Sequence, residues 1–338
     1  MKTAINKTCI MLTLAAAFLL LPATSCNEEW KTEQYEKTVS FVKSGYTEVY
    51  LKYRADGVAP YKIPVVVSGS TFNDKNVEVT VELDPDTMPD LNFGRFRNRE
   101  DLYFKLLEPQ YYALKTNKVT IPAGEEVALL DIDFKLQGLD LVDRHILPLK
   151  VSATSAYEPS PRKHYKKTLM RIVPFNDFSG SYTPSEGEIS LWNTSSSQAA
   201  WERLSAYEDV RELRVVDDST VFFYAGSVEE TALDRARYKV QMKFNPDNTL
   251  TLWADSSVIE FQQLTDDPTF AGAYSTSTET DPTSPYLERR YTIVKMEYRF
   301  KDVTNPLYTI QYRVKCSMTM ERKRNTLIPE EDQQFIFD

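Results

Sequence analysis

Residues 238–253, YKVQMKFNPDNTLTLW, contain the pattern that decides the fold. Apolar and polar side chains alternate on both sides of the segment Asn245–Asn248, with the period of two that is typical of a half-buried β-strand. That segment consists of turn-forming residues, so the two runs predict an antiparallel hairpin. The same alternation recurs at residues 77–83, 130–136 and 310–320. The chain is therefore predicted to be all-β.

Composition narrows the class of protein. The chain has 338 residues, of which 42% are hydrophobic and 26% charged, so it should fold, and its length suggests two domains. Its formal net charge of −9 argues against a nucleic-acid partner, because phosphate binding needs a basic surface.

The first 25 residues have the features of a signal peptide. Lys2 and Lys7 precede an apolar run at residues 10–21, which is too short to span a bilayer. Small residues at 23–25 then precede Cys26, as in bacterial lipoprotein signals, so we expect Cys26 to be lipidated. The alternative is ordinary secretory cleavage with Cys26 incidental. The acidic pair in Asn27–Glu29 resembles the export signal of Bacteroidetes surface lipoproteins, which predicts an outer-membrane protein exposed on the cell surface.

The rest of the chain divides into three parts. Residues 26–38 are polar and read as a tether, 39–173 as an N-terminal β-sandwich domain, and 174–338 as a C-terminal β-barrel-like domain. Two short helices are predicted at residues 101–107 and 198–207. The Thr-, Ser-, Asp- and Pro-rich segment 265–285 reads as a long loop, and loops of that length are often functional.

Several short segments resemble a known pair of domains. In the first half they are YYAL at 111–114, VTIPAG at 119–124 and ILPL at 146–149. In the second half they are RVVDD at 214–218, FFYAG at 222–226, Asp234-Arg235 and IPEEDQ at 328–333. The first set resembles an uncharacterised Bacteroidetes N-terminal domain that also precedes some endo-β-N-acetylglucosaminidases, and the second resembles the uncharacterised C-terminal domain that commonly follows it.

This resemblance implies a fold and a setting. It implies an immunoglobulin-like β-sandwich followed by an antiparallel β-barrel or sandwich, with a lipocalin-like barrel as one form. Lipoproteins of this kind are typically encoded with outer-membrane glycan-uptake systems, which implies a transporter complex as a partner. It supplies no catalytic residues.

No catalytic residues, metal ligands or cofactor motifs are predicted. The chain lacks HExxH, CxxC, G-x-S-x-G and phosphate-loop motifs, and it has only two histidines. Asp131 and Asp133 alternate with apolar residues and should face solvent rather than form a glycosidase site. Asp84, Asp86 and Asp90 lack the spacing of a calcium loop and read as an acidic turn. Cys316 lies in an alternating series and is expected to be a buried small hydrophobe.

Aromatic residues are the better candidates for a binding site. Trp192 and Trp253 alternate away from apolar neighbours, so each would face outward beside polar residues, where a sugar ring could stack. Tyr224 and Tyr286 are weaker candidates of the same kind. The alternative for each is packing over the core, as large aromatic residues usually do. We expect a site at the end of the C-terminal domain formed by Trp192, Trp253 and the segment 265–286.

The sequence thus favours a non-catalytic surface lipoprotein that binds an oligosaccharide or polysaccharide for an uptake system. The alternative is a cell-surface adhesin or structural subunit that binds protein or mucin. A solvent-facing aromatic strip among polar groups would favour sugar, and a broad apolar patch would favour protein.

Replacing Cys26 tests the predicted anchor. The variant Cys26→Ala should be released from the outer membrane or accumulate as a precursor, because acyl chains contribute about 0.8 kcal/mol per buried CH₂ to membrane binding. Cell fractionation followed by immunoblotting measures this. If the variant still fractionates with the outer membrane, the lipoprotein prediction is wrong.

Overall fold

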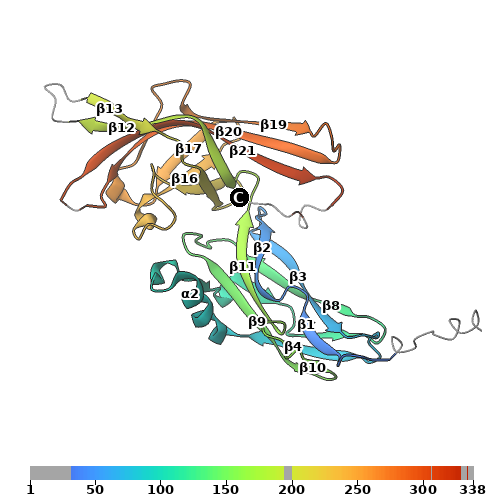
Figure 1. Ribbon diagram of the computed structural model, residues 1–338. Helices are drawn as coiled ribbons and strands as arrows, with labels where there is room; N and C mark the ends of the chain where they lie inside the picture. The colour runs from blue at the N-terminus through green and yellow to red at the C-terminus, as the bar shows by residue number, and fades with distance from the viewer. Residues whose placement is uncertain (1–31, 194–199, 306, 329–332, 334–338) are drawn as a thin grey trace, which may run out of the picture.

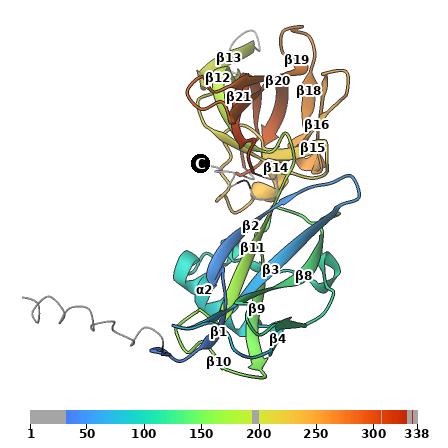
Figure 2. The same ribbon diagram turned by 90° about the vertical axis from the view of Figure 1, so that its right-hand side faces the viewer.

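Alternating sequence becomes β-structure throughout the part of the chain that the computed structural model describes, residues 32–193, 200–305, 307–328 and 333. Figure 1 shows two lobes of β-sheet, and Figure 2 shows the C-terminal lobe stacked on the N-terminal one. The predicted all-β class is confirmed. The signal peptide and Cys26 lie outside the described residues. No helix among the described residues is long and apolar enough to cross a bilayer.

Two sheets packed face to face form the N-terminal lobe. The first sheet has, in spatial order, the strands β10 (Glu158–Pro159), β1 (Thr38–Phe41), β3 (Val58–Ser68), β8 (Val127–Lys135) and β6 (Tyr112–Leu114). The second has β2 (Gly45–Lys52), β11 (Lys167–Phe175), β9 (His145–Thr154), β4 (Val77–Leu83) and β7 (Lys118–Ile121), with β5 (Lys105–Leu106) beside β9. This arrangement agrees with the predicted β-sandwich.

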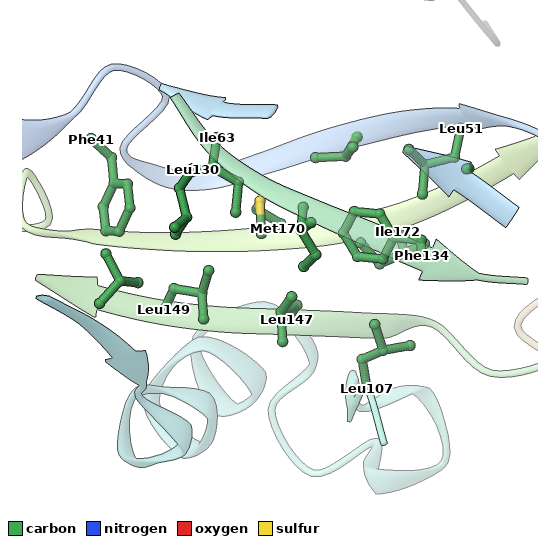
Figure 3. Close-up of a cluster of buried hydrophobic side chains, with 14 of the residues drawn as sticks. Phe41, Leu51, Ile63, Leu107, Leu130, Phe134, Leu147, Leu149, Met170 and Ile172 are labelled. Atoms are coloured by element: carbon green, nitrogen blue, oxygen red, sulfur yellow. The ribbon is translucent and has the colours of Figure 1, made fainter. Parts of the chain in front are cut away.

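The sandwich core follows from the alternation. Leu130 and Phe134 of β8 point toward Leu147 of β9 and Met170 of β11 across the gap between the sheets (Figure 3). Ile132, between them on β8, is fully buried in the same cluster. Side chains of the intervening positions on β8 are half-buried or exposed. The pleat therefore places each apolar run on the inner face.

The C-terminal lobe is one strongly curved antiparallel sheet, nearly closed into a barrel. Its strands, in spatial order, are β17 (Leu250–Ala254), β16 (Lys239–Phe244), β15 (Thr220–Tyr224), β14 (Arg211–Val215), β12 (Gly180–Asn193), β21 (Ile310–Asn325), β20 (Leu287–Asp302) and β18 (Gln262–Leu264). Beside them, β13 (Ala200–Ala206) pairs with β12, and β19 (Ala271–Thr280) pairs with β20. The predicted hairpin is present, since β16 and β17 pair on either side of residues 245–249.

One side chain joins the two ends of this sheet. Gln263 of β18 accepts a hydrogen bond from the Leu252 amide of β17 at 2.8 Å and donates one to the Leu250 carbonyl at 3.0 Å. The side-chain amide thus replaces a main-chain partner where the two strands no longer pair. Gly272, with φ of +96°, leaves room for it, because a Cβ there would lie 2.3 Å from the Gln263 side-chain nitrogen.

The lobes share a buried contact. Strand β15 is buried at all five positions, and Phe222 and Tyr224 on its outer face join the N-terminal core. A polar link runs beside it, since Asn176 donates to the Asp217 carbonyl at 2.7 Å and Arg322 donates to the Asn176 carbonyl at 2.8 Å. The strands before residue 176 build the sandwich and those after residue 179 build the barrel. The division into folding units at residue 174 stays a prediction.

Three sequence predictions of local structure are wrong. Residues 101–107 do not form a helix but a 3-10 turn, η4 (Glu100–Leu102), followed by β5. The described part of the second predicted helix is the strand β13. The predicted loop 265–285 contains the ten-residue strand β19, which is rich in β-branched threonine and pairs along β20. In the last two cases the segment forms a hairpin with the neighbouring strand in sequence, β12 for β13 and β20 for β19, and this pairing decided the structure.

A helix that the sequence did not suggest covers the second sheet. It is α2 (Met88–Phe96), which begins with Pro89 at a position where proline is favoured. Met88 packs with Phe104, Ile146 and Leu169 in a small cluster on the outer face of that sheet.

Replacing Gln263 tests its role in closing the barrel. Gln263→Leu should lower the free energy of unfolding by about 1–3 kcal/mol, because a main-chain amide and a carbonyl lose their partner. The neighbouring Gln262→Leu is the matched control, since that side chain is exposed, and its effect should stay within about 0.5 kcal/mol. Urea unfolding measures both, and equal effects would contradict the assignment.

Candidate functional site

The described tryptophans all lie outside the buried clusters. Trp192 is on β12, Trp201 on β13 and Trp253 on β17, and none belongs to the cores of the sandwich, the barrel or the α2 contact. Trp253 is 37% exposed, and the other two are half-buried. The expectation that Trp192 and Trp253 project away from the core therefore agrees with their positions.

Trp192 and Trp201 form a pair on the outer wall of the barrel. They are register partners on β12 and β13, and their ring centroids are 5.2 Å apart with the planes at 64°. In such an edge-to-face pair the ring that presents its edge is not stacked on its partner through either of its own faces. Figure 1 shows β12 and β13 projecting together at one end of the barrel. The sequence analysis placed Trp201 on a helix over the sheet and so missed this pair.

Polar side chains form the next row of the same wall. Ser190 of β12 lies in register with Arg203 of β13 and Arg313 of β21, and Arg313 is in register with Arg299 of β20. Since positions two apart on a strand share a face, this row borders Trp192 and Trp201. We call Trp192, Trp201, Ser190 and the three arginines the Trp192 wall.

A buried carboxylate fixes one arginine of this wall. Glu297 of β20 is completely buried, and its Oε1 accepts hydrogen bonds from Arg313. Its Oε2 has no hydrogen-bond partner among the described residues. The sequence indicated that Arg313 faces outward, because Gln311, Arg313 and Lys315 alternate with the predicted inward-facing series of residues 310–320.

Trp253 lies on a different part of the barrel. It faces outward on β17 in register with Gln241 of β16, whose amide donates to Asp255. Lys239, further along β16, forms an ion pair with Asp140 of the N-terminal lobe at 3.0 Å. Trp253 thus borders the contact between the lobes and is separated from Trp192 by the strands β16, β15 and β14.

The burial of Tyr224 contradicts the prediction from the sequence. Tyr224 was a candidate for an exposed stacking residue, but its side chain is 6% exposed and packs with the N-terminal core. Burial raises the pKa of its hydroxyl to about 12. The physical reason lies in the sequence TVFFY of β15, which is apolar without alternation, as expected for a strand covered on both faces.

Tyr286 is exposed but lies far from Trp192. It precedes β20 at Leu287, which pairs with Asn325, whereas Leu191 pairs with Tyr312. Residues 312 and 325 are separated by roughly 40 Å along β21 at the usual rise per residue. The structure therefore does not bring Trp192, Trp253 and Tyr286 to one end of the barrel.

Two hollows beside strand β14 are lined by charged groups. One is a cavity of about 40 Å³ bordered by Arg144, Arg171 and Arg214, with room for about one water molecule. Arg214 pairs with Glu230 at 2.6 Å, and Arg171 pairs with Glu48 at 2.5 Å. The second hollow, of about 320 Å³, is lined by four acidic side chains, Arg211 and Tyr224. Three of these four acidic groups form ion pairs with Arg211 or Arg214. The first hollow is lined by residues of both lobes, and the second by residues of the C-terminal lobe.

Asp84 of the acidic turn and Cys316 are both buried. Asp84 is buried and pairs with Lys167 at 2.6 Å. Burial opposes its ionisation, yet hydrogen bonds from Lys167 and Thr87 hold the pKa of Asp84 below its usual value. The described residues contain no group of three or more His, Cys, Asp or Glu side chains able to hold a metal ion. Cys316 is fully buried as predicted, and burial raises the pKa of its thiol to about 12.

Comparisons with known proteins cover both lobes. A family model for the domain of unknown function DUF4973 matches residues 30–155, and a model for a C-terminal domain matches residues 166–319. The chain is similar to a Bacteroides ovatus protein of unknown function of known structure, with 36% identity and a TM-score of 0.76 over 88% of this chain and 99% of that one.

Two further solved structures are similar over most of their length. One is a Bacteroides ovatus multidomain protein including DUF1735, with 35% identity and a TM-score of 0.74 over 89% of this chain and 99% of that one. The other is an auxiliary nutrient binding protein from Bacteroides thetaiotaomicron, with 30% identity and a TM-score of 0.76 over 86% and 95%. No curated protein sequence matches the chain.

Unfolding experiments should show that Tyr224 contributes more to the stability of the protein than Trp253 does. Tyr224→Ala should destabilise the protein by about 3–5 kcal/mol, because it removes a buried aromatic ring between the lobes. Trp253→Ala should cost clearly less than Tyr224→Ala, because Trp253 is 37% exposed and lies outside the core clusters. Urea unfolding of both variants tests this. A small effect of Tyr224→Ala would show that the lobes do not depend on this contact.

Proposed function

Since this chain belongs to the family of two-domain proteins that carry the domain of unknown function DUF4973 ahead of a C-terminal domain, we propose that it binds glycans on the outer wall of its barrel without cleaving them. The Trp192–Trp201 pair carries the proposal. Two half-buried aromatic rings lie outside every described core cluster, beside guanidinium groups. Sugars present CH-rich faces that stack on such rings and hydroxyls that seek polar partners.

The relatives support binding rather than catalysis. A protein of 30% identity over most of this chain is described as an auxiliary nutrient binding protein. The described residues of this chain offer no carboxylate pair beside the tryptophans, since Glu297 is buried under Arg313. General acid–base cleavage of a glycosidic bond needs two carboxyl groups that flank the bond. The proposed activity is therefore capture.

The N-terminal lobe would hold the barrel away from a membrane. Glu33 accepts a hydrogen bond from the Ser70 amide at 2.6 Å, so the last part of the predicted tether is bound to this lobe. It lies at the end marked by β1, β4 and β10, opposite the barrel (Figure 1). If Cys26 is acylated, six Cα–Cα steps separate it from residue 32 and span at most about 21 Å. The proposal includes anchoring at the outer membrane, with the barrel outward and near a glycan transporter.

A protein-binding role is the second candidate. Leu307, Tyr308 and Ile310 are exposed around the start of β21, at the same end of the barrel as Trp192. An apolar group of this kind could contact a protein partner. Because Tyr308 lies outside the Trp192 wall, a variant there separates the two roles.

A glycan array followed by calorimetry tests the proposal. Wild-type protein should bind at least one glycan class, and Trp192→Ala and Trp201→Ala should each weaken binding by about 1 kcal/mol, or several-fold in Kd. Trp253→Ala and Tyr308→Ala are the matched surface controls and should leave the Kd unchanged. Melting curves check that each variant folds.

Each outcome decides something. If no glycan binds, the proposed function is wrong. If only Trp253→Ala weakens binding, the ligand lies at the contact between the lobes and the Trp192 wall is wrong. Loss of affinity only in Tyr308→Ala, for a protein partner such as mucin polypeptide, would favour the adhesin.

A further inference from the structure

The row of the wall next to the tryptophans contains three guanidinium groups and no carboxylate. From edge to edge it comprises Arg203, Ser190, Arg313, Arg299 and Gln262, according to the strand register. The acidic partners of the wall, Glu188 and Glu297, lie one row further from the tryptophans, in register with Lys315. A ligand on the rings therefore meets cationic groups first.

The positive charges of two of these arginines are little compensated by neighbouring carboxylates. Arg299 is exposed, and both of its hydrogen bonds, at 2.9 and 2.5 Å, go to the neutral side-chain oxygen of Gln262. No ion pair of Arg299 is found within the described part of the chain. Arg203 has a 65% exposed side chain and lies 3.9 Å from the 45% exposed Glu188. An exposed pair at that distance contributes little.

The third arginine is held in place. Arg313 is bound to the completely buried Glu297, so its charge is neutralised but its orientation is fixed. Its side chain is still 32% exposed and can donate further hydrogen bonds toward the surface. Guanidinium groups bind planar or tetrahedral oxyanions in forked geometry.

The spacing suits a sugar with a charged substituent. Neighbouring strands are about 4.8 Å apart and same-face positions about 6.7 Å apart, so Arg313 lies roughly 8 Å and Arg299 roughly 12 Å from Trp192 between Cα atoms. Such distances are within reach of the substituents of one or two sugar units stacked on the ring.

We propose that the glycan bound by the Trp192 wall is anionic, and that its carboxylate or sulfate group is held by Arg299 and Arg313. This inference rests on the proposed function. Because the net charge of the chain is −9, most of the surface would repel an anionic ligand. A row of arginines beside the tryptophans therefore favours this wall as the place where such a ligand binds. A nucleic acid would need a basic surface over many phosphates, which this chain lacks.

Charge-matched glycans test the inference by calorimetry. The carboxylate arm compares oligogalacturonate with its methyl ester and sialyllactose with lactose, and the sulfate arm compares sulfated with unsulfated chondroitin oligosaccharides. At least one anionic member should bind several-fold more tightly than its neutral or less charged partner. Its affinity should fall as salt rises, because exposed charges are screened. The comparison that shows this difference identifies whether the bound group is a carboxylate or a sulfate.

Variants locate the charge. Arg299→Gln should weaken binding of the anionic probe about 3- to 10-fold and leave the neutral partner unchanged, and Arg203→Gln should have a smaller effect of the same sign. Arg237→Gln is the matched control, since Arg237 is exposed on the same barrel before β16. Melting curves should match the wild type for all three.

The failures are distinguishable. Equal binding of charged and neutral probes, with the effect of Trp192→Ala intact, would overturn the anionic ligand and leave the proposed function standing. An Arg299→Gln effect no larger than that of Arg237→Gln would likewise overturn it. Absence of binding to every glycan would overturn both.

Discussion

The burial of Phe222 and Tyr224 between the two lobes is the contact on which the rest of the arrangement depends. These rings project from the outer face of β15, where a free barrel would meet water, and instead they complete the N-terminal core. Hydrogen bonds around them, such as that from Arg214 to the Leu141 carbonyl at 3.1 Å, fix the rotation of the barrel on the sandwich. The contact removes one part of the barrel wall from use and leaves the wall at β12, β13, β21 and β20 facing solvent.

The filled interior of the barrel also favours the outer wall as the binding surface. Tyr182, Tyr238 and Tyr298 are fully buried inside the barrel, and a barrel filled with side chains has no room for a ligand. Gln263 closes the remaining gap between β17 and β18 with hydrogen bonds to the main chain. A lipocalin-like barrel was one form that the sequence suggested, but in this barrel the described interior is core. For the proposed function, the ligand must therefore contact the outside.

Period-two patterns were sufficient to predict the strands, the hairpin at residues 245–248 and the burial of Cys316, because alternation reports directly which side of a sheet faces the core. They failed where a segment without clear alternation became a strand by forming a hairpin with its neighbour in sequence. Residues 200–206 became a strand because β12 offers an edge, and β19 formed from a polar segment because β20 extends far enough to pair with it. Tyr224 was misjudged because the run of four apolar residues 221–224 was not taken as part of a strand covered on both sides. Trp192 was recognised as outward-facing, but its neighbours Trp201 and Arg313 depend on strand register, which a single sequence does not reveal.

A shallow wall is suited to the role proposed for it. One stacked ring pair with a few hydrogen bonds corresponds to a Kd near 1 mM, or about −4 kcal/mol. Weak sites become effective when many copies share a surface, since a polymeric glycan then meets a high local concentration of second sites. Each single contact still dissociates quickly, so a captured glycan could pass to the proposed transporter. A deep pocket would hold one sugar more tightly but would slow that transfer, because affinity within one kind of site changes mainly through the dissociation rate. The arginine row fits this logic, because it adds selectivity for charge without enclosing the ligand.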